Sequence, residues 1–129
     1  MAFRHIRTVP ILRSFDEAKA REFYLGFLGF NLDWEHRFEP GLPLYMQVSR
    51  GGAVLHISEH HGDGSPNSLV RLEIVRLREF HAELIEKRYK NNRPGLETPE
   101  WGGLEMTVVD PVNNRLIFAE AEEGAGLSL

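Results

Sequence analysis

Apolar residues recur along the chain with two periods, one typical of strands and one typical of helices. Residues 69–75 show period-2 alternation, with Val70, Leu72 and Ile74 on one face and Arg71 and Glu73 on the other, which predicts a strand with one apolar face. In residues 16–28 and 77–88 apolar side chains recur every three to four positions, which predicts two amphipathic helices. Shorter apolar runs predict further strands at 8–13, 30–37, 44–49, 53–59, 103–109 and 115–118.

Turn-forming residues separate these elements. Ser14 or Asp16 can cap the first helix, and Gly29 can end it. The adjacent glycines in residues 50–52 predict a hairpin. The polar segment 60–68 contains two glycines and a proline, which is typical of a linker. We expect the chain after Glu122 to form a loose tail.

The predicted elements repeat in the same order, a strand, a helix and then three strands. Arg21-Glu22-Phe23 in the first predicted helix recurs as Arg78-Glu79-Phe80 in the second. The 129 residues are enough for one compact domain with a substantial core. We therefore predict an α+β fold, with one domain over 1–129 composed of two βαβββ modules at about 5–61 and 66–121.

A short motif near the C-terminus connects the chain to a known family. Glu100-Trp101-Gly102-Gly103 precedes a predicted strand that ends in an Asp110-Pro111 turn. This order resembles the C-terminal part of the bleomycin resistance proteins, in the vicinal oxygen chelate superfamily with glyoxalase I and the extradiol dioxygenases. The resemblance covers about residues 5–121. It implies two modules whose mixed sheet curls around a cleft, and a homodimer.

Strand periodicity predicts which side chains face that cleft. If the apolar positions of each strand pack on the helices, a polar set faces the other way. This set is His56, Arg71, Glu73, Glu105 and Arg115. Taken singly, each could belong to a solvated ion pair. With aromatic and apolar neighbours they describe a small-molecule cleft, and the predicted ligand-binding residues are Trp34, Tyr45, Met46, His56, Arg71, Glu73, Trp101 and Glu105.

The histidines raise the question of a metal site. His56, Glu59, His60 and His61 have suitable donors, but strand geometry separates them. In the metal-dependent relatives, the first, fourth, fifth and eighth strands each supply one ligand. The resemblance places on those strands Val9, His56, Leu69 (or Val70) and Ile117. Only His56 has a donor, so we predict no metal, no cofactor and no catalytic residue.

Composition narrows the function further. Cysteine is absent, which excludes disulfides, thiolate catalysis and cysteine metal sites. The formal net charge of -4 argues against nucleic acid or an anionic membrane as the main partner. We find no signal peptide in the first ten residues and no apolar run of about 20 residues that could span a membrane. A cytoplasmic protein is the expectation.

Three functional hypotheses follow. The first is a metal-free protein resembling the bleomycin resistance proteins, which sequesters a flat cationic or mixed-charge molecule, such as a bleomycin-type antibiotic, in a cleft at a homodimer interface. The second is an enzyme of the same superfamily that uses His56 with Glu73 or Glu105, or a metal recruited by His60 or His61. The third is a dimer whose cleft binds nothing specific. This fold hosts many activities, so the fold does not choose among them.

Overall fold

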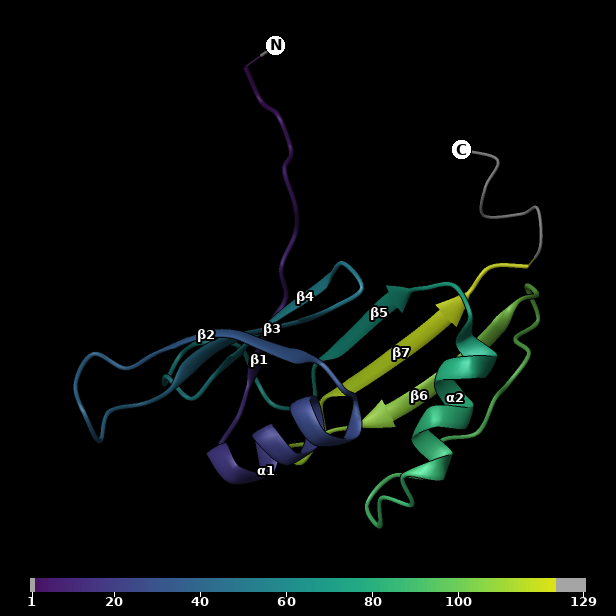
Figure 1. Ribbon diagram of the computed structural model, residues 1–129. Coiled ribbons are helices and arrows are strands. Elements are labelled where there is room, and N and C mark those ends of the chain that lie inside the picture. The colour runs from purple at the N-terminus through teal and green to yellow at the C-terminus, as the bar shows by residue number, and fades with distance from the viewer. Residues whose placement is uncertain (1, 123–129) are drawn as a thin grey trace.

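The computed structural model describes residues 2–122, which form two modules side by side (Figure 1). The first module consists of β1 (Ile11–Arg13), the continuous helical segment α1 (Glu17–Arg21) and η1 (Glu22–Phe27), β2 (Asn31–His36), β3 (Tyr45–Arg50) and β4 (Ala53–Ser58). The second consists of β5 (Leu69–Glu73), α2 (Leu77–Glu86), β6 (Leu104–Val109) and β7 (Arg115–Glu120). The predicted α+β class and the two βαβββ-like modules are confirmed.

The strands form two mixed sheets. Sheet A has the order β1-β4-β3-β2 and sheet B the order β5-β7-β6, with β1–β4 and β5–β7 parallel and the other pairs antiparallel. In the second module, the first of the three strands expected after the helix is reduced to one bridge between Glu97 and Glu105. Two prolines, Pro94 and Pro99, flank this bridge, and a proline cannot donate to a strand ladder.

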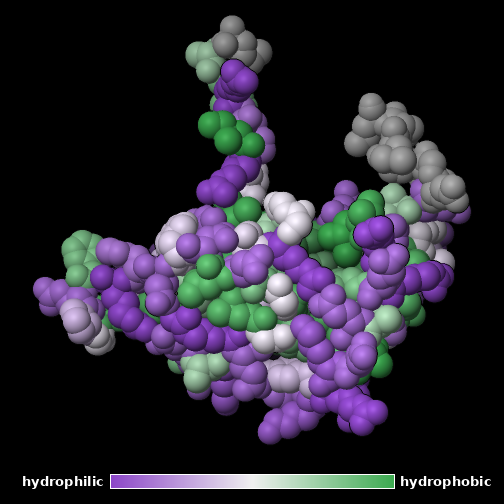
Figure 2. Space-filling model, in the orientation of Figure 1, coloured by the Kyte–Doolittle hydropathy of each residue, from purple (hydrophilic) through white to green (hydrophobic). Residues whose placement is uncertain are grey.

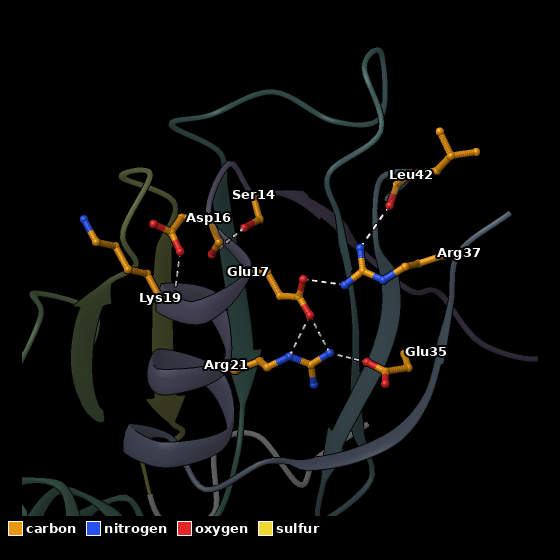
Figure 3. Close-up of polar contacts among 8 residues, drawn as sticks. All are labelled: Ser14, Asp16, Glu17, Lys19, Arg21, Glu35, Arg37 and Leu42. Atoms are coloured by element: carbon orange, nitrogen blue, oxygen red, sulfur yellow. Dashed lines mark hydrogen bonds and ion pairs between the residues drawn. The ribbon is translucent and has the colours of Figure 1, made fainter. Parts of the chain in front are cut away.

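The first helix begins at Asp16, whose side chain accepts a hydrogen bond from the Lys19 amide at 3.0 Å (Figure 3). Asp16, rather than Ser14, is therefore the N-cap. The helix widens to π-type hydrogen bonding at Glu22 and ends before Gly29, whose φ of 72° few other residues adopt readily. Its buried face supplies part of the hydrophobic core, namely Ala20, Phe23, Tyr24 and Phe27.

An ion-pair network attaches this helix to β2 (Figure 3). Glu17 accepts hydrogen bonds from Arg21, at 3.0 Å, and from Arg37, and Arg21 also pairs with Glu35. These side chains are partly exposed, so we expect the network to contribute little net stability. Its structural consequence is orientation. Because Glu35 points toward the helix, the preceding side chain, Trp34, points to the opposite face of sheet A.

A buried polar network connects the two modules at the turn after β6. The carboxylate of Asp110, which is 6% exposed, accepts a hydrogen bond from the Tyr24 hydroxyl at 2.6 Å. It also accepts bonds from the Val112 amide and from the amide and side chain of Asn114. The Asn114 side chain donates in turn to the carbonyl of Arg13, at 3.0 Å. The predicted turn at Asp110-Pro111 is thus also a junction between helix, β1 and sheet B.

The N-terminal residues 2–8 form an extended arm that projects from the body, and the half-buried residues 9–10 lead from it into β1 (Figure 1). The strand predicted for 8–13 begins only at Ile11, because Pro10 has no amide hydrogen to donate. The Pro10 carbonyl accepts a hydrogen bond from the His56 amide at 3.0 Å. The arm carries Phe3 and Ile6, which are 80% and 90% exposed, and hydrophobic side chains lie open along it (Figure 2).

Several element ends differ from the prediction. The second helix ends at Glu86 rather than Arg88, and β7 continues to Glu120 rather than stopping at Phe118. The predicted C-terminal tail from residue 123 onward lies outside the described residues. Among residues 2–122, no helix has the length and apolar character needed to cross a membrane.

Candidate functional site

The polar face of sheet A, opposite the helix, carries a compact group of side chains. Gln47 of β3 pairs directly with His56 of β4, and Trp34 of β2 pairs with Gln47 after a bulge. Residues paired across strands share a face, so these side chains lie together with Tyr45, two positions before Gln47. We call Trp34, Tyr45, Gln47 and His56, with Asp33 in the bulge, the Tyr45–His56 cluster.

Aromatic rings form the open side of this cluster. The rings of Trp34 and Tyr45 lie nearly parallel, with centroids 5.9 Å apart and an interplanar angle of 8°. The His56 ring contacts both with its edge, at 5.3 Å and 5.1 Å. Trp34 remains 43% exposed. The first module therefore presents a rigid aromatic surface to which a flat molecule can be added by stacking.

A directional chain of hydrogen bonds runs beneath the rings. The Asp33 carboxylate can only accept, so the Gln47 amide nitrogen donates to it, at 2.9 Å. This fixes the Gln47 oxygen toward His56 Nε2, 3.0 Å away, and His56 must carry its proton there. His56 Nδ1 then accepts from the Tyr45 hydroxyl at 2.6 Å. The Tyr45 hydroxyl hydrogen is thus committed, and its oxygen is left as an acceptor.

The protonation states agree with this chain. Burial, and secondarily the positive charge of Arg7, lower the pKa of His56 below its usual 6.5. Burial, with the negative charge of Asp63, raises the pKa of Tyr45. A neutral histidine and a protonated tyrosine are the states that a Tyr45 O–H to His56 Nδ1 bond requires. At neutral pH the cluster is therefore uncharged except at its outer end, Asp33.

Met46 does not belong to this face. It is fully buried and packs in the core on the helix side of sheet A. Tyr45 and Met46 are consecutive in β3, and consecutive strand residues point to opposite faces. The same rule, applied from Tyr45 in steps of two, leads to Gln47 and Ser49, which the sequence reasoning missed. Both donate to the Asp33 carboxylate, at 2.9 Å.

The polar face of sheet B has a different character. Arg71 and Glu73 lie on the side of β5 away from the core, as the alternation predicts. Arg71 pairs with Glu105 of β6 at 2.6 Å and with Glu73 at 3.4 Å. Hydrogen bonding to Glu105 raises the pKa of Arg71, which keeps its charge. Arg115 of β7 also lies on this face and is exposed.

Trp101 stands apart from both groups. It is 72% exposed in the turn before β6, and no aromatic partner lies against it within residues 2–122. The turn requires its glycines, because Gly102 and Gly103 have φ values of 90° and 80°. A Cβ at Gly103 would also lie 2.5 Å from the Glu120 carbonyl oxygen. Within one chain, the predicted binding residues thus occupy four separate places: the outer face of sheet A, the core at Met46, the outer face of sheet B, and the turn at Trp101.

The residues present do not fit a metal of the kind that the metal-dependent relatives hold. The pairing of β1 with β4 puts Ile11, rather than Val9, beside His56, and Leu69 and Ile117 share the outer face of sheet B. All of these neighbours are apolar, and both His56 nitrogens are hydrogen-bonded. Within residues 2–122, no three acidic or histidine side chains gather closely enough to hold a metal ion.

Comparison with known proteins places this fold in a family. The family model described as "Glyoxalase superfamily protein" matches residues 2–125, nearly the whole chain. The chain belongs to the glyoxalase superfamily. A search of curated proteins found no significant match. The predicted relationship to the vicinal oxygen chelate superfamily, near its bleomycin resistance proteins, is confirmed.

Several solved structures share the architecture. A bleomycin-binding protein complexed with bleomycin is 25% identical, covers 92% of this chain and 100% of its own, and gives a TM-score of 0.68. The bleomycin-binding protein from Streptomyces verticillus, complexed with copper(II)-bleomycin, is 25% identical over 93% of this chain and 99% of its own, with a TM-score of 0.67. A bleomycin resistance determinant encoded on transposon Tn5 is 23% identical, with coverages of 92% and 99% and a TM-score of 0.69.

Proposed function

We propose that this glyoxalase-superfamily chain is a small-molecule binding protein of the bleomycin-resistance type, which acts in the cytoplasm. It sequesters a flat antibiotic-like molecule without covalent chemistry, and so holds the molecule away from its target. One observation carries the proposal: the parallel Trp34 and Tyr45 rings, supported by a fully bonded polar chain. The two similar structures that contain bleomycin support the class of ligand.

The chemistry of the Tyr45–His56 cluster suits binding better than reaction. Trp34 offers a large contact area at low entropic cost, and the neighbouring rings hold it in place. The Tyr45 oxygen, whose hydrogen is committed to His56, can accept a hydrogen bond from a donor group on the ligand. Positive groups on the ligand would meet Glu73 and Glu105 of sheet B, and Trp101 would form a second stacking wall. This binding requires no metal.

The proposal includes a homodimer with the cleft at its interface. The arm exposes Phe3 and Ile6, which a lone protomer leaves in water. Beside it, β4 pairs with β1 only from His56 onward, so residues 53–55 face a groove of about 1760 Å³ that extends to β5. An open strand edge next to an apolar arm favours association with a second copy. In such a dimer, the sheet B residues of one protomer could complete the cleft of its partner.

An enzyme of the same superfamily remains the alternative, and the Tyr45–His56 bond of 2.6 Å is the observation in its favour. A hydroxyl bonded to a histidine can exchange protons with a substrate. However, Glu73 and Glu105 are bonded to Arg71 rather than to His56. The acid/base pair expected between His56 and a carboxylate is therefore not assembled within one protomer.

The decisive experiment is calorimetric titration of untagged, chelator-treated protein with copper-free bleomycin, repeated after adding nickel, zinc or iron. We expect micromolar or tighter binding without metal, weakened at least about tenfold by Trp34→Ala, since aromatic anchors dominate such sites. Phe38→Ala is the matched control, because Phe38 is an exposed aromatic outside the cluster. Absent drug binding together with stoichiometric metal uptake, lost in His56→Ala, would overturn the proposal in favour of the enzyme.

The dimer requires its own measurement. Sedimentation equilibrium of the unmodified protein should give twice the protomer mass, and Phe3→Ser with Ile6→Ser should shift the equilibrium toward the protomer. If Trp101 lines the cleft, Trp101→Ala should weaken binding of the drug without changing the mass measured by sedimentation equilibrium. A monomer that binds the drug tightly would refute the interface cleft but keep the stacking site.

A further inference from the structure

A second pocket lies in the other module, at the C-terminal end of α2. Its volume is about 340 Å³, at the lower end of the range for small-molecule sites. Leu84, Ile85 and Tyr89 supply an apolar wall, and Arg88, Asn92 and Arg93 supply the polar rim. None of these residues belongs to the Tyr45–His56 cluster or to the polar face of sheet B.

Contacts outside the pocket hold its walls in place. The Tyr89 ring stacks on Phe27 with centroids 4.7 Å apart. The Asn92 side chain donates to the Val109 carbonyl at 2.6 Å and accepts from the Val109 amide at 3.0 Å, which fixes the loop along the edge of β6. Two of the lining residues, Tyr89 and Asn92, are therefore held in place by neighbouring elements.

Arg88 has an unusual backbone conformation. Its φ is 51°, in the left-handed region where glycine or asparagine usually ends a helix. Its amide still donates to the Ile85 carbonyl, at 3.1 Å. An arginine at this position costs more conformational energy than a glycine would, and such strain clusters at functional sites. In this conformation Arg88 is one of the residues that line the pocket.

The two rim arginines have no partner of their own. Among residues 2–122, neither Arg88 nor Arg93 makes a side-chain hydrogen bond or an ion pair, whereas the nearby Glu83 is bonded to Arg50 at 2.7 Å. The C-terminal end of α2 carries roughly half a negative charge, and the Glu22 carboxylate lies near Tyr89, but the two full positive charges outweigh both together. The rim is therefore a net cationic site beside an apolar wall.

We propose that this pocket binds a small organic anion, with a carboxylate or phosphate group on an aromatic or aliphatic body. The guanidinium groups match the planar, two-oxygen edge of such an acid. The body would lie against Leu84, Ile85 and Tyr89. This site is separate from the proposed antibiotic cleft, and either can exist without the other.

The test is a titration of ¹⁵N-labelled protein with 2-naphthoate, followed by amide chemical shifts. Its neutral analogue 2-naphthamide and inorganic phosphate are titrated alongside. We expect 2-naphthoate to shift the amides of residues 84–93, with 2-naphthamide and phosphate each binding at least about tenfold more weakly, because the charge and the body both contribute. Shifts confined to strands β2 to β4, or equal binding of acid and amide, would overturn the proposal.

Substitution of each arginine tests whether its charge contributes to anion binding. Arg88→Asn removes the guanidinium but tolerates the left-handed backbone, and Arg93→Gln removes the other charge where no such constraint exists. Each should weaken 2-naphthoate about tenfold with an unchanged thermal midpoint. Arg78→Gln, an exposed arginine in the first turn of α2, is the control and should bind like the unmodified protein. If Arg88→Asn and Arg93→Gln bind 2-naphthoate as tightly as the Arg78→Gln control and the unmodified protein do, the site is refuted.

Discussion

Two polar networks in this molecule use the same kinds of group in opposite settings. At the junction of the modules, the Asp110 carboxylate accepts from Tyr24 and Asn114, and all three residues are nearly inaccessible to water. On sheet A, the Asp33 carboxylate also ends a chain with a tyrosine, through Gln47 and His56, but its outer members are exposed. The chemistry is similar, and burial differs.

Burial decides what each network can do. A buried group that loses its partner incurs the full cost of desolvation, so the Asp110 network stabilises the fold. Its groups are buried and bonded to one another, so they are not available to hydrogen-bond a ligand. The Asp33 chain can lose a partner to water at little cost. Its rings and the Tyr45 oxygen remain accessible, so the same arrangement orients a binding surface. The comparison predicts large effects on stability at one network and effects on binding at the other.

The largest expected effect is at Asp110. Asp110→Ala leaves the Tyr24 hydroxyl and the Asn114 side chain without a partner, and we expect the free energy of unfolding to fall by about 3–5 kcal/mol. Urea denaturation followed by circular dichroism measures it. Asp33→Ala is the matched control and should barely change stability. Equal losses in the two variants would break the comparison.

Tyr24 should show a smaller effect with a characteristic pH dependence. Burial, the charge of Asp110 and their hydrogen bond raise the pKa of Tyr24 well above 10. Because the folded-state pKa is raised, this stabilisation is complete below pH 10 and is lost as pH rises above it. Tyr24→Phe should cost about 1–2 kcal/mol at pH 8 and less at pH 10.5. A constant cost at the two pH values would contradict the assignment.

His56 should titrate in the opposite sense. Its folded-state pKa lies below 6.5, so the unfolded chain takes up the proton first as pH falls. The stabilisation is therefore present above pH 6.5 and is lost as pH falls through the folded-state pKa. We expect the His56 ring signals in an NMR titration to move below pH 6.5, and His56→Gln to flatten the acid side of the stability profile. A midpoint at or above 6.5 would disprove the neutral Tyr45–His56 pair.

The smallest effect belongs to the ion pair on sheet B. Arg71 and Glu105 lie 2.6 Å apart, but Arg71 is 42% exposed. A double-mutant cycle with Arg71→Gln and Glu105→Gln should give a coupling of about 0.5 kcal/mol, reduced by salt. Coupling above about 2 kcal/mol would mean that this face is closed to solvent, as it would be in a dimer cleft.

The alternation of side chains along each strand gave most of the predictions about the site. It assigned Arg71, Glu73 and His56 to outer faces, because one side chain in two must point away from the helices. It was not applied to Tyr45 and Met46, which are consecutive and so cannot both face the cleft, and Met46 faces the core. Gln47 passed unnoticed because an amide alone indicates no chemistry. Its role depends on Asp33, which a bulge brings to the same face.

The sequence by itself determined the α+β class, the two modules, their turns and the apolar faces, since these follow from local periodicity and from residues that favour turns. Only the tertiary structure decided which polar groups meet. The tautomer of His56 depends on three strands side by side, and Asp110 reaches Tyr24 across 86 residues of chain. Such contacts depend on strand register and the packing of one module on the other, and no local pattern encodes either.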